Sequence, residues 1–279
     1  MRVVFIGAGN IAVSLAIGLQ ERGHGIVQVW SRTEVSACQL AGRLEGGVQA
    51  TASLDCIVTD ADLYVLAVKD GVLVQMAEQL AGILRYKRVA GKERLFVHVA
   101  CTQAVEVLAP LREFGRTGVL YPFQSFVRSR VVDLSKVAFF VEGDDEDSRQ
   151  AVRELARSFS AKVYDSSLEQ RQYLHFAGNM AANFSNCLYC IAKEVLDEAQ
   201  LPFEVLFPIV EETAHKIQTL SPREAQSGPA VRGDEVTIEK HLALIDRLST
   251  MTATDQTSPV ALKDMYGFFT HNIQRRANG

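Results

Sequence analysis

The sequence predicts two parts, an α/β domain of the dinucleotide-binding type over residues 1–166 and an all-helical domain over residues 167–279. Two observations carry this prediction. Up to about residue 166, short uncharged runs typical of buried strands alternate with helical stretches, as a parallel sheet requires. From about Ser167 onward only helical patterns follow. A chain of 279 residues is long enough for two ordinary domains.

The composition excludes several classes of protein. Apolar residues make up 48% and charged residues 22% of the chain, which are the proportions of a globular protein. A net charge of −4 without a cluster of Lys and Arg argues against a nucleic-acid partner. The N-terminus does not read as a signal peptide, and no stretch is apolar enough to cross a membrane. We therefore expect a cytoplasmic protein.

The first twelve residues predict a dinucleotide site. A buried strand at Val3–Ile6 is followed by Gly7, Gly9 and Ala12, at the spacing Gly-x-Gly-x-x-Gly/Ala. Gly7 permits a tight turn, and Gly9 lets the backbone approach a pyrophosphate. A helix over 10–22 would then point its free N–H groups at the phosphates. The alternative is a glycine-rich turn in an unrelated α/β protein. The cofactor contacts expected here are Gly7, Ala8, Gly9, Asn10 and Ile11.

The residues after the second strand, Ile26–Trp30, indicate which dinucleotide fits. An NAD site generally places Asp or Glu here, whereas this chain has Ser31, Arg32 and Thr33. A guanidinium with two hydroxyls would hold a 2′-phosphate, which a carboxylate would repel. The alternative for Arg32 is a solvated loop residue. We expect NADP(H) rather than NAD(H) at this position.

Five further strands are predicted in the α/β domain. Two further helices are predicted there, over 72–84 and 147–160. Ligands of open α/β sheets bind at the carboxyl ends of the strands. The residues at two of those ends should therefore lie beside the cofactor, although a lysine at a place such as Lys69 is more often a solvated loop charge. These strands are Leu63–Val68, Leu95–Val99, Val119–Tyr121, Ala138–Val141 and Lys162–Tyr164, and the expected contacts are Ala67, Val68, Lys69, Ala100 and Cys101.

One long helix over 168–199 opens the second domain. Between Arg171 and Lys193 it carries no formal charge, so we expect it to be buried and to face a site or a partner chain. Four polar residues share one of its faces, either facing a site or cross-linking the core. Its Cys-x-x-Cys pair reads as two buried structural cysteines. The polar residues are His175, Asn179, Asn183 and Asn186, and the cysteines are Cys187 and Cys190.

Three more helices complete the chain. Gly228, Pro229 and Gly233 should break the helical pattern, and Asp234 is a good N-cap for the helix that follows. Arg232 in this break could hold an anion or a carbonyl. His241 reads as a core histidine. The expected helices are Phe203–Leu220, Glu235–Ser249 and Pro259–Arg276.

Four stretches resemble a known family. They are 5–10 (Phe-Ile-Gly-Ala-Gly-Asn), 121–126 (Tyr-Pro-Phe-Gln-Ser-Phe), 175–183 and 227–234 (Ser-Gly-Pro-Ala-Val-Arg-Gly-Asp). The chain is similar to bacterial NADP oxidoreductase-like proteins with a Rossmann domain and a C-terminal helical domain of unknown function. Their wider group includes pyrroline-5-carboxylate reductase, deazaflavin-dependent NADP oxidoreductase, ketopantoate reductase and the β-hydroxyacid dehydrogenases. The resemblance implies a 6-phosphogluconate-dehydrogenase-like helical domain that forms a homodimer, with the active site between the domains.

The chain departs from these relatives at three places. Tyr121 stands where members usually have His, and Ala100-Cys101 stands where they tend to have Ser-Gly. In the β-hydroxyacid dehydrogenases and ketopantoate reductase, a Lys at the start of the long helix is the acid/base, with Asn four residues on. This chain has His175 and Asn179 at that spacing.

We therefore expect an NADP-dependent oxidoreductase that transfers a hydride to or from a small carbonyl, imine or hydroxy compound. His175 would be the general acid/base, Asn179 would hydrogen-bond the substrate oxygen, and Arg232 would anchor an acidic group. One alternative is a redox sensor or scaffold that binds NADP without catalysis. Another is hydride transfer to a flavin or deazaflavin. No metal site is expected, and the sequence names neither the substrate nor an oligomer beyond a homodimer.

Overall fold

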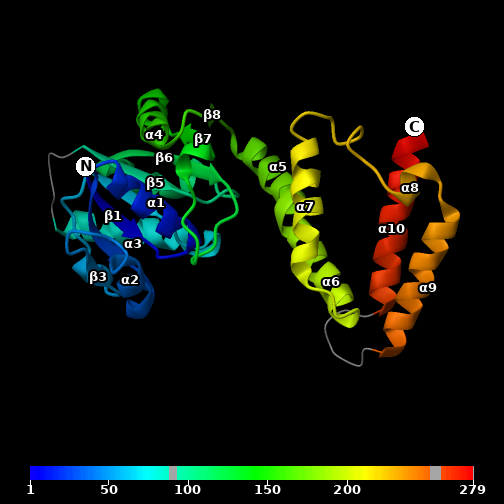
Figure 1. Ribbon diagram of the computed structural model, residues 1–279. Coiled ribbons are helices and arrows are strands. Elements are labelled where there is room, and N and C mark those ends of the chain that lie inside the picture. The colour runs from blue at the N-terminus through cyan, green and yellow to red at the C-terminus, as the bar shows by residue number, and fades with distance from the viewer. Residues whose placement is uncertain (88–92, 252–258, 279) are drawn as a thin grey trace. The chain divides into compact units, whose positions relative to one another are not determined.

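The computed structural model describes residues 1–87, 93–251 and 259–278. The chain divides into two compact units, Met1–Ala182 and Asn183–Gly279 (Figure 1). The sequence pattern changes from mixed to helical near residue 166, but helix α5 (Leu168–Gly178) groups with the first unit.

A single eight-stranded sheet forms the centre of the first unit. Its order is β3-β2-β1-β4-β5-β6-β7-β8, and all neighbours are parallel except the antiparallel pair β6 and β7. The first six strands follow the Rossmann order 3-2-1-4-5-6, which confirms the predicted fold class. The strands are β1 Arg2–Ile6, β2 Gly25–Trp30, β3 Gln49–Thr51, β4 Leu63–Leu66, β5 Arg94–His98, β6 Gly115–Phe123, β7 Ala138–Gly143 and β8 Val163–Asp165.

Helical segments cover both faces of this sheet (Figure 1). Strand β1 shows why, because Val3 and Phe5 pack into one apolar cluster with α1, α2 and α4, whereas Val4 and Ile6 pack into another with α3 and η3. Alternate residues of a strand point to opposite faces, so an uninterrupted apolar run needs cover on both. The helices are α1 Asn10–Glu21, α2 Glu34–Ala41, α3 Leu73–Tyr86 and α4 Glu146–Phe159, and the 3₁₀ segments are η1 Leu54–Cys56, η2 Asp70–Val72, η3 Val105–Phe114 and η4 Leu134–Lys136.

Several elements of this unit have no counterpart in the sequence prediction, among them α2, β3 and η3. Helix α2 and the three-residue strand β3 are short, and short elements carry little periodicity. Segment η3 contains Pro110, which interrupts the helical pattern. Strand β6 is also longer than predicted, because pairing with β5 and with β7 extends it at both ends.

The long helix after β8 forms, but it is not continuous α-helix. Helix α5 passes into a π-helical turn η5 (Asn179–Phe184) and then α6 (Ser185–Glu198). The π turn interrupts the 3.6-residue period on which the single polar face was predicted. The prediction of burial was wrong for the single chain, since no residue of α6 is buried. Cys187 and Cys190 are exposed as well.

The second unit is helical, as predicted. Residues 229–232 were expected to interrupt the helices but form the one-turn helix α8, because Pro is favoured in a first turn and Gly233 ends it with a φ of +63°. Asp234 is the predicted cap, accepting from the Thr237 N–H at 3.1 Å. His241 is not a core residue, since it is exposed and bonds Tyr266 at 2.7 Å. The remaining elements are η6 Phe203–Leu206, α7 Phe207–Lys216, α9 Glu235–Met251 and α10 Pro259–Asn278. Within the described ranges, no helix combines the length and apolarity that a membrane crossing requires.

Candidate functional site

The turn after β1 lies where the strand order reverses, between β1 and β4. The Gly7 N–H donates to the Trp30 carbonyl at 2.8 Å, and Gly7 has a φ of +111°. A Cβ on Gly7 would lie 2.3 Å from the Ala67 carbonyl oxygen. The close approach of two strand ends and the left-handed backbone therefore both require glycine here.

Gly9 is different, because the packing of the protein does not require it. Its φ is −78°, and among the described residues a Cβ would meet only the Ala67 carbonyl oxygen, 3.9 Å away. Gly9 also caps α1 without a side-chain hydrogen bond, and the first turn of α1 holds no acidic residue. Open space above uncapped N–H groups at a helix N-terminus suits a phosphate. The residues present therefore fit the pyrophosphate of a dinucleotide.

The neighbouring residues of this turn serve the fold with their side chains. Ala8 is buried, Ile11 packs against the core, and the Asn10 amide donates to the Phe126 carbonyl at 3.1 Å. Their backbone groups are therefore the main groups left for a cofactor.

The end of β2 carries the residues expected to meet a 2′-phosphate. Ser31 is buried, and its N–H donates to the Thr51 carbonyl at 3.1 Å. The Thr33 hydroxyl caps α2 by accepting from the Ser36 N–H at 3.4 Å. Arg32 is exposed and makes no hydrogen bond or ion pair within the described part of the chain. Its guanidinium is therefore available to a ligand.

The loops after β4 and β5 lie next to each other. The Thr102 hydroxyl donates to the Asp70 carboxylate, which joins the two loops. Lys69, one residue earlier, is exposed. Ala67 is half-buried against Gly7, and Val68 packs against the apolar cluster of α3.

Behind these loops, Arg171 is a fully buried cation on the first turns of α5. It forms an ion pair with Glu142 of β7, and it donates to the carbonyls of Cys101 at 3.4 Å and Gln103 at 2.9 Å. The Cys101 thiol donates in return to the Arg171 carbonyl at 3.0 Å. Arg171 thereby fixes α5 to the carboxyl end of β5. Sequence reasoning missed this residue, because an arginine near the start of a helix ordinarily reads as exposed.

Two more buried polar side chains, Tyr121 and His98, lie on strands β6 and β5. The Tyr121 phenol hydrogen-bonds the Cys101 thiol, and burial raises the pKa of both groups. His98 is fully buried, with Nδ1 accepting from the Ala100 N–H at 3.2 Å and Nε2 lying 3.2 Å from the Ala104 carbonyl. This pattern requires the neutral Nε2-protonated ring. Burial, and then the nearby Arg171 charge, lower the His98 pKa to about 4.

The candidate acid/base lies on the same helix. His175 is exposed, one turn beyond Arg171, and its backbone lies within hydrogen-bonding reach of the Cys101 thiol. Gly178 packs so closely on β6 that a Cβ would lie 2.9 Å from the Phe123 ring. The face of α5 that carries these residues therefore meets the carboxyl ends of β5 and β6. Asn179 follows as the first residue of the π turn and is half-buried.

The remaining predicted site residue belongs to the second unit. Arg232 ends the one-turn helix α8 and is exposed. Its neighbour Asp234 has a lowered pKa, chiefly because Thr237 donates to its carboxylate from its side chain and its backbone.

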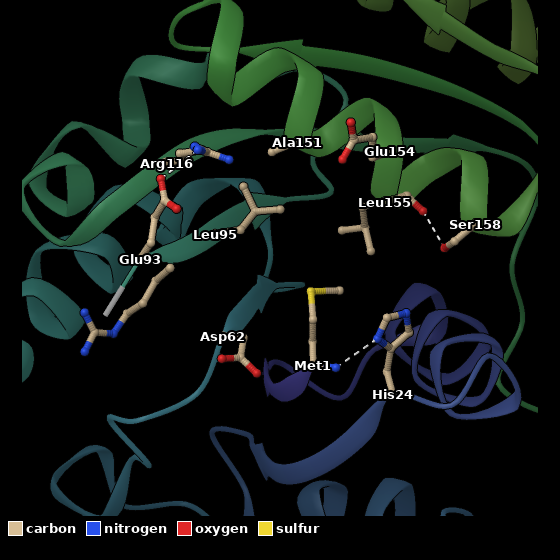
Figure 2. Close-up of a pocket in the computed structure, with 11 residues that line it drawn as sticks. Met1, His24, Asp62, Glu93, Leu95, Arg116, Ala151, Glu154, Leu155 and Ser158 are labelled. Carbon is tan, nitrogen blue, oxygen red and sulfur yellow. Dashed lines mark hydrogen bonds and ion pairs between the residues drawn. The ribbon is translucent and has the colours of Figure 1, made fainter. Parts of the chain in front are cut away.

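A cavity of about 340 Å³ lies at the opposite edge of the sheet, at the amino ends of the strands (Figure 2). Several charged groups that line it already pair with one another. The Met1 amine lies 3.3 Å from His24, and Arg116 lies 2.7 Å from Glu93. No predicted site residue lines this cavity.

The described histidine, cysteine and carboxylate side chains bear on whether the chain holds a metal site or a disulfide. Among the residues that the structure describes, no group of three or more His, Cys, Asp or Glu side chains is placed to hold a metal ion. All five cysteines are free thiols.

Two family models match the chain. The one described as "NADP oxidoreductase coenzyme F420-dependent" matches residues 2–112, and the one described as "Domain of unknown function (DUF2520)" matches residues 137–266. No curated protein matches the chain.

Solved structures similar to the chain include a candidate NADP oxidoreductase from Bacteroides fragilis. It is 34% identical, the match covers 98% of each chain, and the TM-score is 0.83. A pyrroline-5-carboxylate reductase from Coxiella burnetii is 17% identical over 99% of this chain and 97% of its own, with a TM-score of 0.55. An imine reductase from Myxococcus stipitatus, solved with NADP+, is 14% identical over 100% and 94%, with a TM-score of 0.61. The last two establish a likeness of fold alone.

Proposed function

Because the chain belongs to the NADP oxidoreductase family in which the coenzyme-F420-dependent type of domain precedes a DUF2520 domain, we propose that it is an NADP(H)-dependent enzyme that reduces or oxidises a small carbonyl, imine or hydroxy compound. The observation that carries the proposal is the turn at Gly7–Gly9. Gly9 leaves open space over an uncapped helix N-terminus, although the packing of the described residues does not require glycine there.

The choice of NADP(H) over NAD(H) rests on Arg32. Its guanidinium has no partner within the described part of the chain and stands where an NAD site generally has a carboxylate. Arginine suits a phosphate because it can donate two parallel hydrogen bonds. Ser31 and Thr33 would contribute mainly backbone groups, since Ser31 is buried and the Thr33 hydroxyl caps α2.

The chemistry is assigned to α5. When bound, NADP(H) supplies or accepts the hydride. His175 is exposed beside the carboxyl end of β5, and we assign it the proton that accompanies reduction of the substrate at its oxygen or nitrogen. Asn179, one turn further, would hydrogen-bond the same substrate atom. Arg232 of the second unit would bind an acidic group of the substrate.

The proposal is tested first by titrating the protein with NADPH and NADH. Trp30 is the sole tryptophan and lies directly before Ser31, so its fluorescence reports on the site. We expect binding of NADPH and much weaker binding of NADH. A screen of cyclic imines, ketones and 2-oxo acids with NADPH then tests turnover. Absence of binding to both nucleotides would overturn the proposal.

The catalytic role of His175 is tested by substituting this residue. His175→Ala should keep the NADPH affinity and reduce turnover by about 10²–10⁴-fold, the usual contribution of a general acid/base. His215→Ala, which removes another exposed histidine, is the matched control and should keep full turnover. Turnover that is unchanged in His175→Ala would remove this residue from the mechanism.

A redox sensor or scaffold that binds NADP(H) without catalysis is the second candidate. The observation that favours it is the absence of a lysine at the position of His175, together with the buried thiol of Cys101 behind the loop. Isotope exchange from labelled NADPH into any accepted compound separates the two functions. Nucleotide binding without exchange into any screened compound would favour the sensor.

We also propose a homodimer formed through the C-terminal helices. Large apolar side chains of the second unit remain exposed, among them Phe207 at 48%, Ile209 at 63% and Phe268 at 64%. Apolar surface of this extent usually marks an interface. Sedimentation equilibrium should give twice the chain mass, and Ile209→Asp should shift the protein toward the monomer.

The five free thiols suit the reducing cytoplasm, where we place the enzyme.

A further inference from the structure

The segment that follows β6 crosses the start of α1, and we call residues 124–133 the strap. Its ends are fixed to α1, because the Phe126 carbonyl accepts from Asn10 at 3.1 Å and the Val132 N–H donates to the Ser14 hydroxyl at 3.2 Å. Phe126 and Val132 also pack against the core beside α1. The Arg130 N–H donates to the Val127 carbonyl at 3.2 Å, which closes a tight turn between the two ends.

Arg128 projects from this turn onto the glycine-rich turn. Its Nη2 donates to the Ala8 carbonyl at 2.5 Å, and its Nη1 donates to the Gln39 side chain of α2 at 3.1 Å. The Arg43 guanidinium in turn donates to the Arg128 carbonyl at 2.6 Å. A cation therefore lies directly beside Ala8, between the two glycines, and a second guanidinium holds its backbone.

The charge of Arg128 is not neutralised by another described residue. It forms no ion pair with any carboxylate of the described residues, and its side chain is exposed. Arginine carries five N–H donors, of which the two contacts above use two. The strap is already held by Asn10, Ser14 and apolar packing, so its attachment does not require a positive charge.

We propose that Arg128 is a cofactor-binding residue that contacts a phosphate group of NADP(H). The inference rests on the proposed function, because it takes the glycine-rich turn as the dinucleotide site. Both kinds of phosphate group in NADP(H) carry negative charge on their oxygens. The Arg128 guanidinium would bind those oxygens with its unused N–H donors while it keeps its hydrogen bond to the Ala8 carbonyl. The pyrophosphate and the 2′-phosphate are the two phosphates that reach this side of the turn in a Rossmann site.

The experiment measures dissociation constants for NADPH and NADH by Trp30 fluorescence in the full-length protein. Arg128→Gln should weaken NADPH binding by about tenfold or more, the effect of losing a charge-assisted hydrogen bond. An equal loss for NADH identifies the pyrophosphate, and a loss for NADPH alone identifies the 2′-phosphate. Arg130→Gln, on the same turn, is the matched control and should bind both nucleotides nearly as the wild type does.

Two outcomes overturn the inference. If Arg128→Gln binds NADPH as tightly as Arg130→Gln while the wild type binds it, Arg128 only fastens the strap and the proposed function stands. If the wild type binds neither nucleotide, the proposed function and this inference fall together. Should Arg128→Gln not fold, Arg128→Lys replaces it, since lysine keeps the charge without the planar fork. It should weaken NADPH binding at least threefold relative to Arg130→Lys, and an unchanged affinity would count against the contact.

Discussion

Cys101 and Arg171 are hydrogen-bonded to each other twice. The thiol donates to the Arg171 carbonyl at 3.0 Å, and Arg171 Nε donates to the Cys101 carbonyl at 3.4 Å. Cys101 lies in the loop after β5, and Arg171 lies near the start of α5, the helix that carries His175. Together with the ion pair to Glu142, this reciprocal contact sets where α5 lies against the sheet.

Removal of the Arg171 side chain should therefore destabilise the first unit strongly. Arg171→Gln leaves the Gln103 carbonyl and the Glu142 carboxylate without their donor, and breaking a buried ion pair costs about 3–5 kcal/mol. Urea unfolding followed by Trp30 fluorescence measures the loss. Arg85→Gln is the control, because its partner Glu113 and Arg85 itself are half exposed, and it should cost less than about 1 kcal/mol. Equal losses would show that the burial of Arg171 is unimportant.

Stability should fall as the pH is lowered from 7 to 5, because of His98. Its pKa is about 4 in the folded protein against the ordinary histidine value of 6.5, so in this range the unfolded chain binds a proton that the folded protein does not. The loss amounts to about 2 kcal/mol at pH 5. His98→Gln should flatten the pH dependence of the unfolding free energy.

A second histidine needs to be separated from this effect. The pKa of His24 is also lowered, first by partial burial and then by the charge of the N-terminal amine. His24→Gln should remove a smaller part of the slope between pH 7 and 5. A slope that His98→Gln leaves unchanged would contradict the neutral, buried state of His98.

The two glycines of the turn should respond differently to alanine. Gly7→Ala places a Cβ 2.3 Å from the Ala67 carbonyl at a φ of +111°, and should cost at least about 2 kcal/mol of unfolding free energy. Gly9→Ala should change stability within about 1 kcal/mol but weaken NADPH binding at least tenfold. Thermal unfolding and Trp30 titration separate the two effects. Normal NADPH affinity in Gly9→Ala would argue against a pyrophosphate above that residue.

Arg32→Ala should discriminate between the two nucleotides. Loss of a charge-assisted hydrogen bond to the 2′-phosphate is worth about 1.5–3 kcal/mol, so the dissociation constant for NADPH should rise by about ten- to a hundredfold. NADH has no 2′-phosphate, and its affinity should stay within about threefold of the wild type. Folding should be unaffected, since Arg32 has no partner in the described part of the chain. Equal losses for both nucleotides would remove the 2′-phosphate assignment.

Much of the fold follows from local patterns. The uncharged strand at 3–6, the glycine spacing after it and the helix that follows all agree, and the structure has β1, the turn and α1 in that order. Helix α2 and strand β3 could not be predicted in the same way, because they are too short to show a period. The π turn at 179–184 also leaves no pattern in the sequence.

The residues of the candidate site also differ in whether a local sequence pattern could identify them. Glycine spacing identified the turn, because the backbone geometry of a strand-to-helix turn depends on a few adjacent residues. Arg171 and Arg128 escaped notice, because each contacts residues more than 60 positions away in the chain. An exposed arginine and a buried one have the same sequence signature.

Local sequence patterns were enough to place most of the strands and helices along the chain, and to locate the glycine-rich turn, since both depend on hydrophobic periodicity and local backbone freedom. Three relationships became visible only in the folded chain: packing requires Gly7 but not Gly9, Arg171 is buried against the loop after β5, and Arg128 contacts Ala8. These relationships arise where segments distant in the chain meet at one edge of the sheet. Contacts of that kind depend on strand order and loop paths, which no local pattern specifies.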